Sequence, residues 1–328
     1  MEFVRNKQLM SRLLLGDGLG RAGKSLLCHV LTGFETVEKI QYYNFLEHLS
    51  LAHYHKKISD DMALALIRTQ MDVAIFDQMN GRNINTRPDD YTGLNNYHSP
   101  HIYIERQNRK EHSQPNYVGN PNATSIINKI NQENPIFLTF THNLISKSEI
   151  IFDAFRKKVN FVYLNRLPVD LIHEWHVKGF GERIGTDPTE MKFLISHNGE
   201  SIPEYCYGWE QEYVDASPLE RVAKIIHSCF KGNHEALMKH KDNNQIIVID
   251  FESLVTNPNK EIEKISSFLN LKPLNIMDDI LKKNDCPRII DQKEFARRNK
   301  YINAEISVKY QNLLEETNIL HKEISKLT

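Results

Sequence analysis

Residues 13–27 read LLLGDGLGRAGKSLL, and this stretch decides the fold of the chain. Its leading leucines predict a short buried strand, and the apolar period from Leu26 to Leu31 predicts a helix that Ser25 opens. Between them, Gly18-x-x-x-x-Gly23-Lys24-Ser25 has the spacing of a P-loop. Glycines let backbone N–H groups converge on an oxyanion, and a helix N-terminus adds partial positive charge. The stretch therefore predicts a phosphate-binding loop; the plainer alternative is a strand–helix turn that needs glycines.

Composition narrows the class of protein. The 328 residues include 41 Lys+Arg and 42 Asp+Glu, a net charge of −1, which gives no overall attraction to nucleic acid or to a membrane surface. No apolar run approaches the roughly 18 residues of a membrane helix, and the polar N-terminus is unlike a signal peptide. The 4 cysteines form no C-x-x-C pair, which fits a reducing compartment. We therefore expect a cytoplasmic protein with no nucleic-acid partner and no membrane span.

Strand and helix patterns alternate along the chain. Further strands are predicted at 135–140, 159–164 and 245–249, and helices at 42–53, 60–73, 148–155, 169–177 and from 218 onward, where Ser217 and Glu220 form a capping box. This alternation predicts an α/β fold with a P-loop-type central parallel sheet flanked by helices. We expect one domain over 1–328, with helical and loop insertions at about 80–125 and 179–240, loops at 81–91 and 113–122, and a C-terminal helix at 303–327.

Polar residues follow three of the predicted strands. The glycine-rich loop follows the first strand, Thr141-His142 follows 135–140, and Asn165-Arg166 follows 159–164. Because ligands of parallel sheets bind at the carboxyl ends of the strands, we expect these residues to share one site. The plainer alternatives are that His142 is a strand-end histidine capped by backbone and that Arg166 pairs with Asp170 one helical turn on.

Four segments, in this order, resemble the motifs of the sulfotransferase family. Residues 18–27, GLGRAGKSLL, resemble G-x-P-R-S-G-T-S-L-L, and residues 140–144, FTHNL, resemble a strand that ends in K-T-H-L-P. Residues 163–171, YLNRLPVDL, resemble Y-V-x-R-N-P-x-D-V, and residues 249–258, IDFESLVTNP, resemble V-R-Y-E-D-L-V-x-N-P. Together they span most of the chain.

The resemblance implies an enzyme that moves a sulfuryl group in line from 3′-phosphoadenosine 5′-phosphosulfate to a hydroxyl of a small-molecule or glycan acceptor, without a metal. His142 would take the acceptor proton, a task suited to an imidazole that ionises near neutral pH. Arg21 would offset charge on the leaving phosphate oxygen, and Arg166 would grip the 3′-phosphate. The amides of Gly23, Lys24 and Ser25 would hold the 5′-phosphosulfate. The implied catalytic residues are His142, Arg21 and Lys24. The implied nucleotide-binding residues are Gly20, Arg21, Ala22, Gly23, Lys24, Ser25, Leu26 and Arg166.

Two residues depart from the family pattern. Lys24 stands where the family usually has Ser or Thr, and it completes a kinase-like P-loop. Glu174 stands where a serine is expected eight residues after Arg166, and a carboxylate there would repel a 3′-phosphate. Either Glu174 points away, or the nucleotide differs from the family's usual one, or a nearby cation compensates: Arg183, Arg297 or Arg298.

Two other functions remain open from the sequence. A P-loop kinase or NTPase would use the loop together with Asp250, which ends the strand 246–249 and would hold Mg²⁺ as a Walker-B aspartate. A catalytically silent nucleotide-binding homologue would keep the fold and have lost nucleotide affinity through Glu174. A glycan acceptor is suggested by the polar cluster 82–87 and by the aromatic segment 205–209, because aromatic faces suit sugar rings.

Overall fold

The centre of the computed structural model, which describes residues 1–108 and 121–327, is a five-stranded sheet in the order β2-β3-β1-β4-β7. All neighbouring strands are parallel, and Leu13 lies opposite Phe137 and Val159. The strands are β1 (Arg12–Asp17), β2 (Gln41–Tyr42), β3 (Ile136–Phe140), β4 (Val159–Asn165) and β7 (Ile246–Asp250). This confirms the predicted α/β fold with a central parallel sheet.

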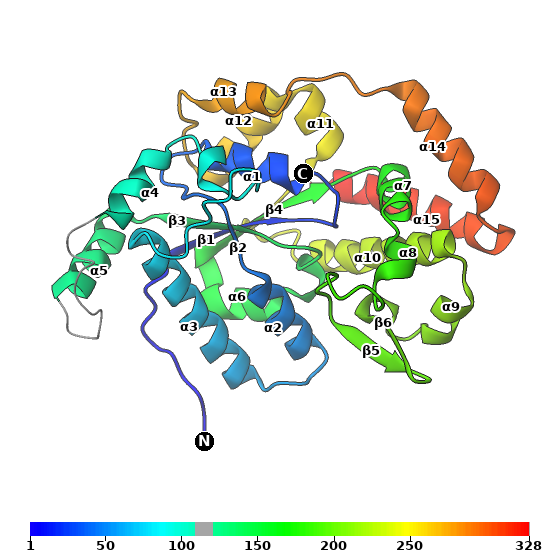
Figure 1. Ribbon diagram of the computed structural model, residues 1–328, viewed down its shortest axis with the longest axis horizontal. Helices are drawn as coiled ribbons and strands as arrows, with labels where there is room; N and C mark the ends of the chain where they lie inside the picture. The colour runs from blue at the N-terminus through cyan, green and yellow to red at the C-terminus, as the bar shows by residue number, and fades with distance from the viewer. Residues whose placement is uncertain (109–120, 328) are drawn as a thin grey trace.

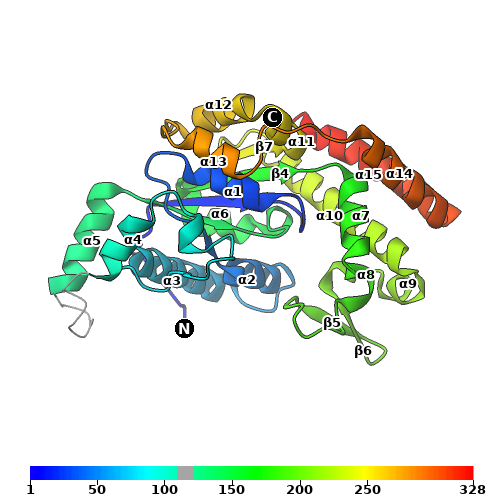
Figure 2. The ribbon, with the colours of Figure 1, turned by 45° about the horizontal axis from the view of Figure 1, so that its top comes forward.

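Helices cover both faces of this sheet. Figure 2 shows α1, α12 and α13 above it and α2, α3 and α6 below it. Strands covered on both sides read as continuous apolar runs, and this is why the strand predictions were correct. The helices are α1 (Lys24–Thr32), α2 (Asn44–Tyr54), α3 (Asp60–Met79), α4 (Pro100–Gln107), α5 (Pro121–Glu133), α6 (Glu149–Phe155), α7 (Pro168–Val177), α8 (Phe180–Arg183), α9 (Glu210–Asp215), α10 (Pro218–Lys239), α11 (Phe251–Thr256), α12 (Pro258–Leu269), α13 (Met277–Lys283), α14 (Gln292–Glu305) and α15 (Val308–Ser325).

The predicted segments differ from the structure in three places. Tyr42, expected to begin a helix, lies in the short edge strand β2, and α2 begins two residues later. The insertion after residue 179 contains a hairpin of β5 (Leu194–His197) and β6 (Glu200–Pro203), which turns at Asn198-Gly199 where both φ angles are positive. The C-terminal helix expected at 303–327 is in fact α14 and α15, separated at Ile306-Ser307.

Other expectations agree with the structure. Ser217 and Glu220 form the predicted capping box of α10, which runs beside α15 in Figure 1. Residues 81–91 are irregular and are held by hydrogen bonds such as Asn85 Nδ2 to Thr92 Oγ1, 2.8 Å.

Of the loop expected at 113–122, residues 113–120 lie outside the described residues, and the rest begins α5. Across the described chain, no helix has the length and hydropathy needed to cross a bilayer.

Candidate active site

The glycine loop, residues 18–25, lies at the carboxyl end of β1 and leads into α1 (Figure 1). Gly18 and Gly23 have φ angles of 144° and 101°, which other residues rarely adopt. A Cβ on Gly23 would lie 2.4 Å from the Phe251 ring, and one on Gly18 would lie 2.6 Å from the Leu164 carbonyl oxygen. Both glycines are therefore required by close packing as well as by backbone conformation. In the first turn of α1, the Leu26 and Leu27 amides donate to the Gly23 carbonyl oxygen at 3.1 and 3.3 Å. The amides of Lys24 and Ser25 have no acceptor among the described residues and can bind an anion.

Lys24 supports the glycine loop from inside. Its buried Nζ donates hydrogen bonds to the carbonyl oxygens of Gly18, 2.9 Å, and Leu19, 2.5 Å. Burial lowers the pKa of Lys24 to about 8, against the opposing effect of the Asp17 carboxylate. The ammonium is therefore mostly charged at neutral pH. It adds positive potential behind the loop and does not extend from its surface.

Asp17 connects the end of β1 to the segment that follows β3. Its fully buried carboxylate accepts hydrogen bonds from Thr141 Oγ1 at 2.9 Å and from the backbone amides of Leu144 and Ile145 at 3.1 and 2.8 Å. Burial raises the pKa of Asp17. No local sequence pattern pointed to this role of Asp17, because its partners lie more than a hundred residues away along the chain. The contacts fix the backbone on both sides of His142.

His142 is held by Glu47 of α2. Glu47 Oε1 lies 3.1 Å from both the backbone nitrogen and the Nδ1 of His142. Burial lowers the pKa of His142 to about 4, and the positive charge of Lys24 adds to this, so the expectation of an ionisation near neutrality is wrong. A neutral ring donates Nδ1–H to the carboxylate and leaves Nε2 with a free lone pair. At neutral pH the ring can therefore accept a proton at Nε2.

Arg21 is the cation that faces Glu174. Their side chains form an ion pair at 3.2 Å, in which 49% of the Arg21 side chain stays exposed. The three arginines expected to compensate Glu174 have other partners: Arg183 pairs with Glu190, Arg297 with Glu294, and Arg298 with Asp170 and Glu294. Glu174 is therefore neutralised by the glycine loop itself.

Arg166 lies against the other side of the glycine loop. Its guanidinium donates to the carbonyl oxygen of Arg21 and stacks over the Phe251 ring at 4.6 Å. The alternative pairing with Asp170 is not formed, since that carboxylate binds Arg298 at 3.0 Å. Burial lowers the pKa of Arg166, and its buried Nε has no hydrogen-bond partner among the described residues. Such an orphaned donor is rare in a folded protein and suits an anionic ligand.

A cavity of about 260 Å³ opens beside Arg166. Arg288 and Arg298 also line it, together with the aromatic rings of Phe251 and Phe295. Glu252 lies in its wall and accepts a hydrogen bond from the backbone of Leu167 at 3.1 Å, and burial raises the pKa of this carboxyl to about 7. The cavity thus places three guanidinium groups and two ring faces next to the glycine loop. Four carboxyl groups also line it, and two of them pair with Arg298: Asp170 and Glu294, besides Glu252 and Asp291.

The structure therefore brings the three predicted strand ends to one loop. Arg166 hydrogen-bonds to the loop backbone, and His142 is connected to it through the contacts of Asp17. The remaining candidates form the turn between them: Gly20 is packed under Trp175, whose Nε1 donates to its carbonyl oxygen at 2.8 Å. The Ala22 amide donates within the loop to Leu19, while Ser25 and Leu26 belong to the first turn of α1.

Comparisons with known proteins identify the family of this chain. A family model described as "Sulfotransferase domain" matches residues 63–288, more than half of the chain, although the match begins after the glycine loop. A search of the curated proteins finds no match. Among solved structures, the chain is similar to a sulfotransferase domain from the curacin biosynthetic pathway, with 12% identity, a TM-score of 0.50, and coverage of 97% of this chain and 99% of that one.

Two further structures have the same description. A sulfotransferase domain from the olefin synthase of Synechococcus PCC 7002 is 13% identical, with a TM-score of 0.46 and coverage of 99% and 98%. A sulfotransferase from Alicyclobacillus acidocaldarius is 13% identical, with a TM-score of 0.37 and coverage of 89% and 94%. The fold and the family match together define an α/β transferase. The chain belongs to the sulfotransferase family.

Proposed function

We propose that this enzyme transfers a sulfuryl group from 3′-phosphoadenosine 5′-phosphosulfate to an acceptor hydroxyl. The observation that carries the proposal is that two strand ends contact one glycine loop: Arg166 hydrogen-bonds to the Arg21 carbonyl oxygen, and Asn143, next to His142, hydrogen-bonds to the Gly18 carbonyl oxygen. The donor supplies an activated sulfur: its bond to the bridging phosphate oxygen breaks and a bond to the acceptor oxygen forms. The electron pair of the broken bond leaves with the phosphate.

We assign the proton of the acceptor hydroxyl to His142. Its neutral imidazole has Nε2 free to accept, and Glu47 holds the ring by Nδ1. As the ring becomes positively charged, the Glu47 carboxylate at 3.1 Å stabilises it. In this arrangement the imidazole accepts the proton and the Glu47 carboxylate orients the ring, as is usual for a histidine base.

The basic residues would offset the negative charge of the donor. Arg166, with its unpaired Nε, would hold a phosphate of the nucleotide in the cavity that it shares with Arg288 and Arg298. Arg21 is exposed enough to leave Glu174 and contact a group bound at the loop amides. Lys24 would act through its charge from behind the loop.

Two organisational proposals accompany this function. Residues 1–328 would act as one domain, since a single cluster of buried apolar residues extends from Met10 to Ile324. The enzyme would work in the cytoplasm, since all 4 cysteines are free and buried.

Isothermal titration tests the proposed donor. We expect adenosine 3′,5′-bisphosphate to bind equally well with EDTA and with Mg²⁺, because the groups assigned to it are guanidinium and amide donors. ATP is the comparison ligand under both conditions. Binding of ATP that requires Mg²⁺, without binding of the bisphosphate, would overturn the proposal in favour of a kinase or NTPase, and binding of neither would indicate a silent homologue.

A further inference from the structure

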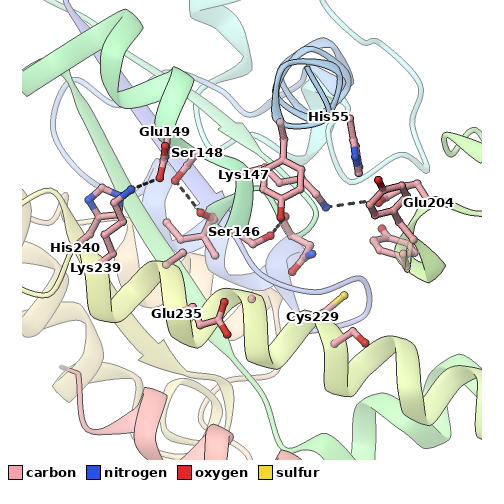
Figure 3. Close-up of a pocket in the computed structure, with 18 of the residues that line it drawn as sticks. His55, Ser146, Lys147, Ser148, Glu149, Glu204, Cys229, Glu235, Lys239 and His240 are labelled. Atoms are coloured by element: carbon pink, nitrogen blue, oxygen red, sulfur yellow. Dashed lines mark hydrogen bonds and ion pairs between the residues drawn. The ribbon is translucent and has the colours of Figure 1, made fainter. Parts of the chain in front are cut away.

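A groove of about 440 Å³ has Asn143, the residue after His142, in its wall. It is bounded by the C-terminal end of α2, by the one-turn helices η3 (Ile145–Lys147) and η5 (Glu204–Cys206), and by α10; we call it the α10 groove. Figure 3 shows Lys147 and Glu204 on one side of it and Lys239 and Glu149 on the other. Its volume falls within the range of roughly 300–1,000 Å³ typical of small-molecule sites.

The α10 groove adjoins the pocket that His142 lines. A smaller pocket of about 30 Å³ is lined by Glu47 and His142, and it shares Asn143, Lys147 and Tyr205 with the α10 groove. A molecule in the groove can therefore place one of its groups next to His142. The α10 groove and the cavity beside Arg166 share no lining residue, so the two are separate.

Aromatic rings form much of the groove wall. Tyr54 and Tyr207 are 58% and 66% exposed, and Tyr205 and Trp209 lie half-buried beside them. Lys147 Nζ lies 6.0 Å from the Tyr54 ring and 5.8 Å from the Tyr205 ring. Exposed tyrosines in a concave site provide an apolar face and a hydroxyl at low entropic cost. Ring faces of this kind suit the C–H faces of sugars.

Asn143 supplies a polar group that lacks a partner. The residue is 5% exposed, has a φ of 60°, and is fixed by the hydrogen bond from its amide to the Gly18 carbonyl oxygen at 3.1 Å. Its Oδ1 is buried without a hydrogen-bond partner in the described part of the chain, and the residue lines both pockets. Buried polar atoms are nearly always satisfied, so this oxygen indicates a missing donor such as a hydroxyl.

The charges of the groove argue against an anionic occupant. Lys147 pairs with Glu204 at 3.6 Å, and Lys239 pairs with Glu149. Glu235 extends from α10 toward the groove (Figure 3) and forms no ion pair with the residues that the structure describes. Burial lowers the pKa of His55 and of His240, which disfavours their charged forms. The groove therefore has its cations neutralised and one carboxylate left over.

We propose that the α10 groove binds the acceptor and that the acceptor is a neutral oligosaccharide of two or three sugar rings. Its rings stack on Tyr54 and Tyr207, one hydroxyl donates to Asn143 Oδ1, and the reacting hydroxyl reaches His142. That the bound saccharide is an acceptor rests on the sulfuryl transfer proposed above. Binding to the groove does not require the donor, so the two are tested separately.

The test measures saccharide binding to the full chain by saturation-transfer NMR and titration. The probes are cellotriose, maltotriose and triacetylchitotriose, with trigalacturonic acid as the anionic counterpart. We expect at least one neutral trisaccharide to bind, and the double variant Tyr54→Ala/Tyr207→Ala to weaken it at least tenfold. Tyr301→Ala is the matched control, an exposed tyrosine on α14 outside the groove, and should leave binding unchanged. Failure of all three neutral probes, or unchanged binding by the double variant, overturns the assignment.

A second variant tests the charge argument. Glu235→Gln should raise binding of trigalacturonic acid at least threefold and leave the neutral probe within twofold. Stronger binding of trigalacturonic acid than of every neutral probe by the unmodified enzyme would overturn the neutral-acceptor assignment. Titration with adenosine 3′,5′-bisphosphate is run on the same samples. Loss of nucleotide binding with intact saccharide binding contradicts the donor proposal alone, and the reverse contradicts the groove proposal alone.

Discussion

At the scale of single residues, His142 is the general base that we propose. Because the ring is held by Glu47 and faces the acceptor side, His142→Ala should lower turnover by about 10²- to 10⁴-fold, the usual contribution of a general base. The affinity for adenosine 3′,5′-bisphosphate should stay within about twofold, since the imidazole does not contact the nucleotide. Steady-state turnover and titration on the same variant check both. A variant with full activity would remove His142 from the mechanism.

The pKa of His142 predicts an unusual pH profile. A base must be unprotonated, and burial lowers the pKa of this ring to about 4. Turnover should therefore be lost as the pH falls through about 4, and should be flat from about pH 5.5 to 7, below the pKa of about 8 of Lys24. The measurement is kcat/KM across this range, with thermal melting at each pH to confirm that the enzyme stays folded. A rise in rate centred between pH 6 and 7 would contradict the burial argument.

Arg166 is the residue that we propose to bind the nucleotide. Arg166→Ala should weaken binding of adenosine 3′,5′-bisphosphate by about 1.5–3 kcal/mol, the usual contribution of a hydrogen bond to a charged group. Arg297→Ala is the control, because Arg297 is exposed, pairs with Glu294 and does not line the cavity. Equal affinities for the two variants, measured by titration, would show that the cavity beside Arg166 does not hold the nucleotide.

The sequence predicted the placement of a residue where its position along a strand was enough. His142 and Arg166 were expected at one edge of the sheet because each follows an apolar strand, and parallel strands end at the same edge. Glu47, Asp17 and Asn143 were missed because their roles depend on contacts with distant segments, such as the bond between Glu47 and His142, 95 residues apart. Pairing between remote segments leaves no local sequence pattern.

At the scale of elements, the glycine loop depends on its contact with α11. Gly23→Ala adds a Cβ 2.4 Å from the Phe251 ring at a φ of 101°, and we expect it to lower the free energy of unfolding by about 2–4 kcal/mol. Gly208→Ala is the matched control: its φ is 89°, but no atom lies within 4 Å of the added carbon. Urea unfolding of both variants separates the cost of a positive φ angle, which both share, from the cost of the contact with Phe251, which only Gly23→Ala has. Similar losses would mean that Phe251 moves aside freely.

Elements were predicted well where burial was complete on both faces. The four longer central strands were all anticipated because their apolar runs are covered by helices on each side. Strand β2 was missed because it is only two residues, Gln41–Tyr42, at the edge of the sheet. The β5–β6 hairpin was missed although Asn198-Gly199 is a typical hairpin turn, since its flanking strands are short and mostly exposed.

At the scale of the whole molecule, Glu252 couples stability to pH. Burial raises the pKa of Glu252 to about 7 from a usual 4.5. Its contribution to the free energy of unfolding is full below pH 4.5 and is lost as the pH rises through about 7, because the unfolded chain releases this proton earlier. The side chain of Glu252→Gln stays neutral at every pH. As the pH rises from 5 to 8, the free energy of unfolding of this variant should therefore increase by about 1–3 kcal/mol relative to that of the unmodified enzyme. A stability difference that does not change with pH, by urea unfolding, would contradict this.

The central claim concerns the whole enzyme: one glycine loop joins nucleotide binding by Arg166 to proton transfer by His142. The most direct measurement follows ³⁵S from labelled 3′-phosphoadenosine 5′-phosphosulfate to a neutral trisaccharide that binds the α10 groove, with EDTA present, for the unmodified enzyme and for His142→Ala. We predict label transfer with formation of one adenosine 3′,5′-bisphosphate per transfer, and at least a hundredfold slower transfer by the variant at equal donor affinity. Transfer that is absent from the unmodified enzyme although donor and trisaccharide both bind, or that is unchanged by the variant, would contradict it.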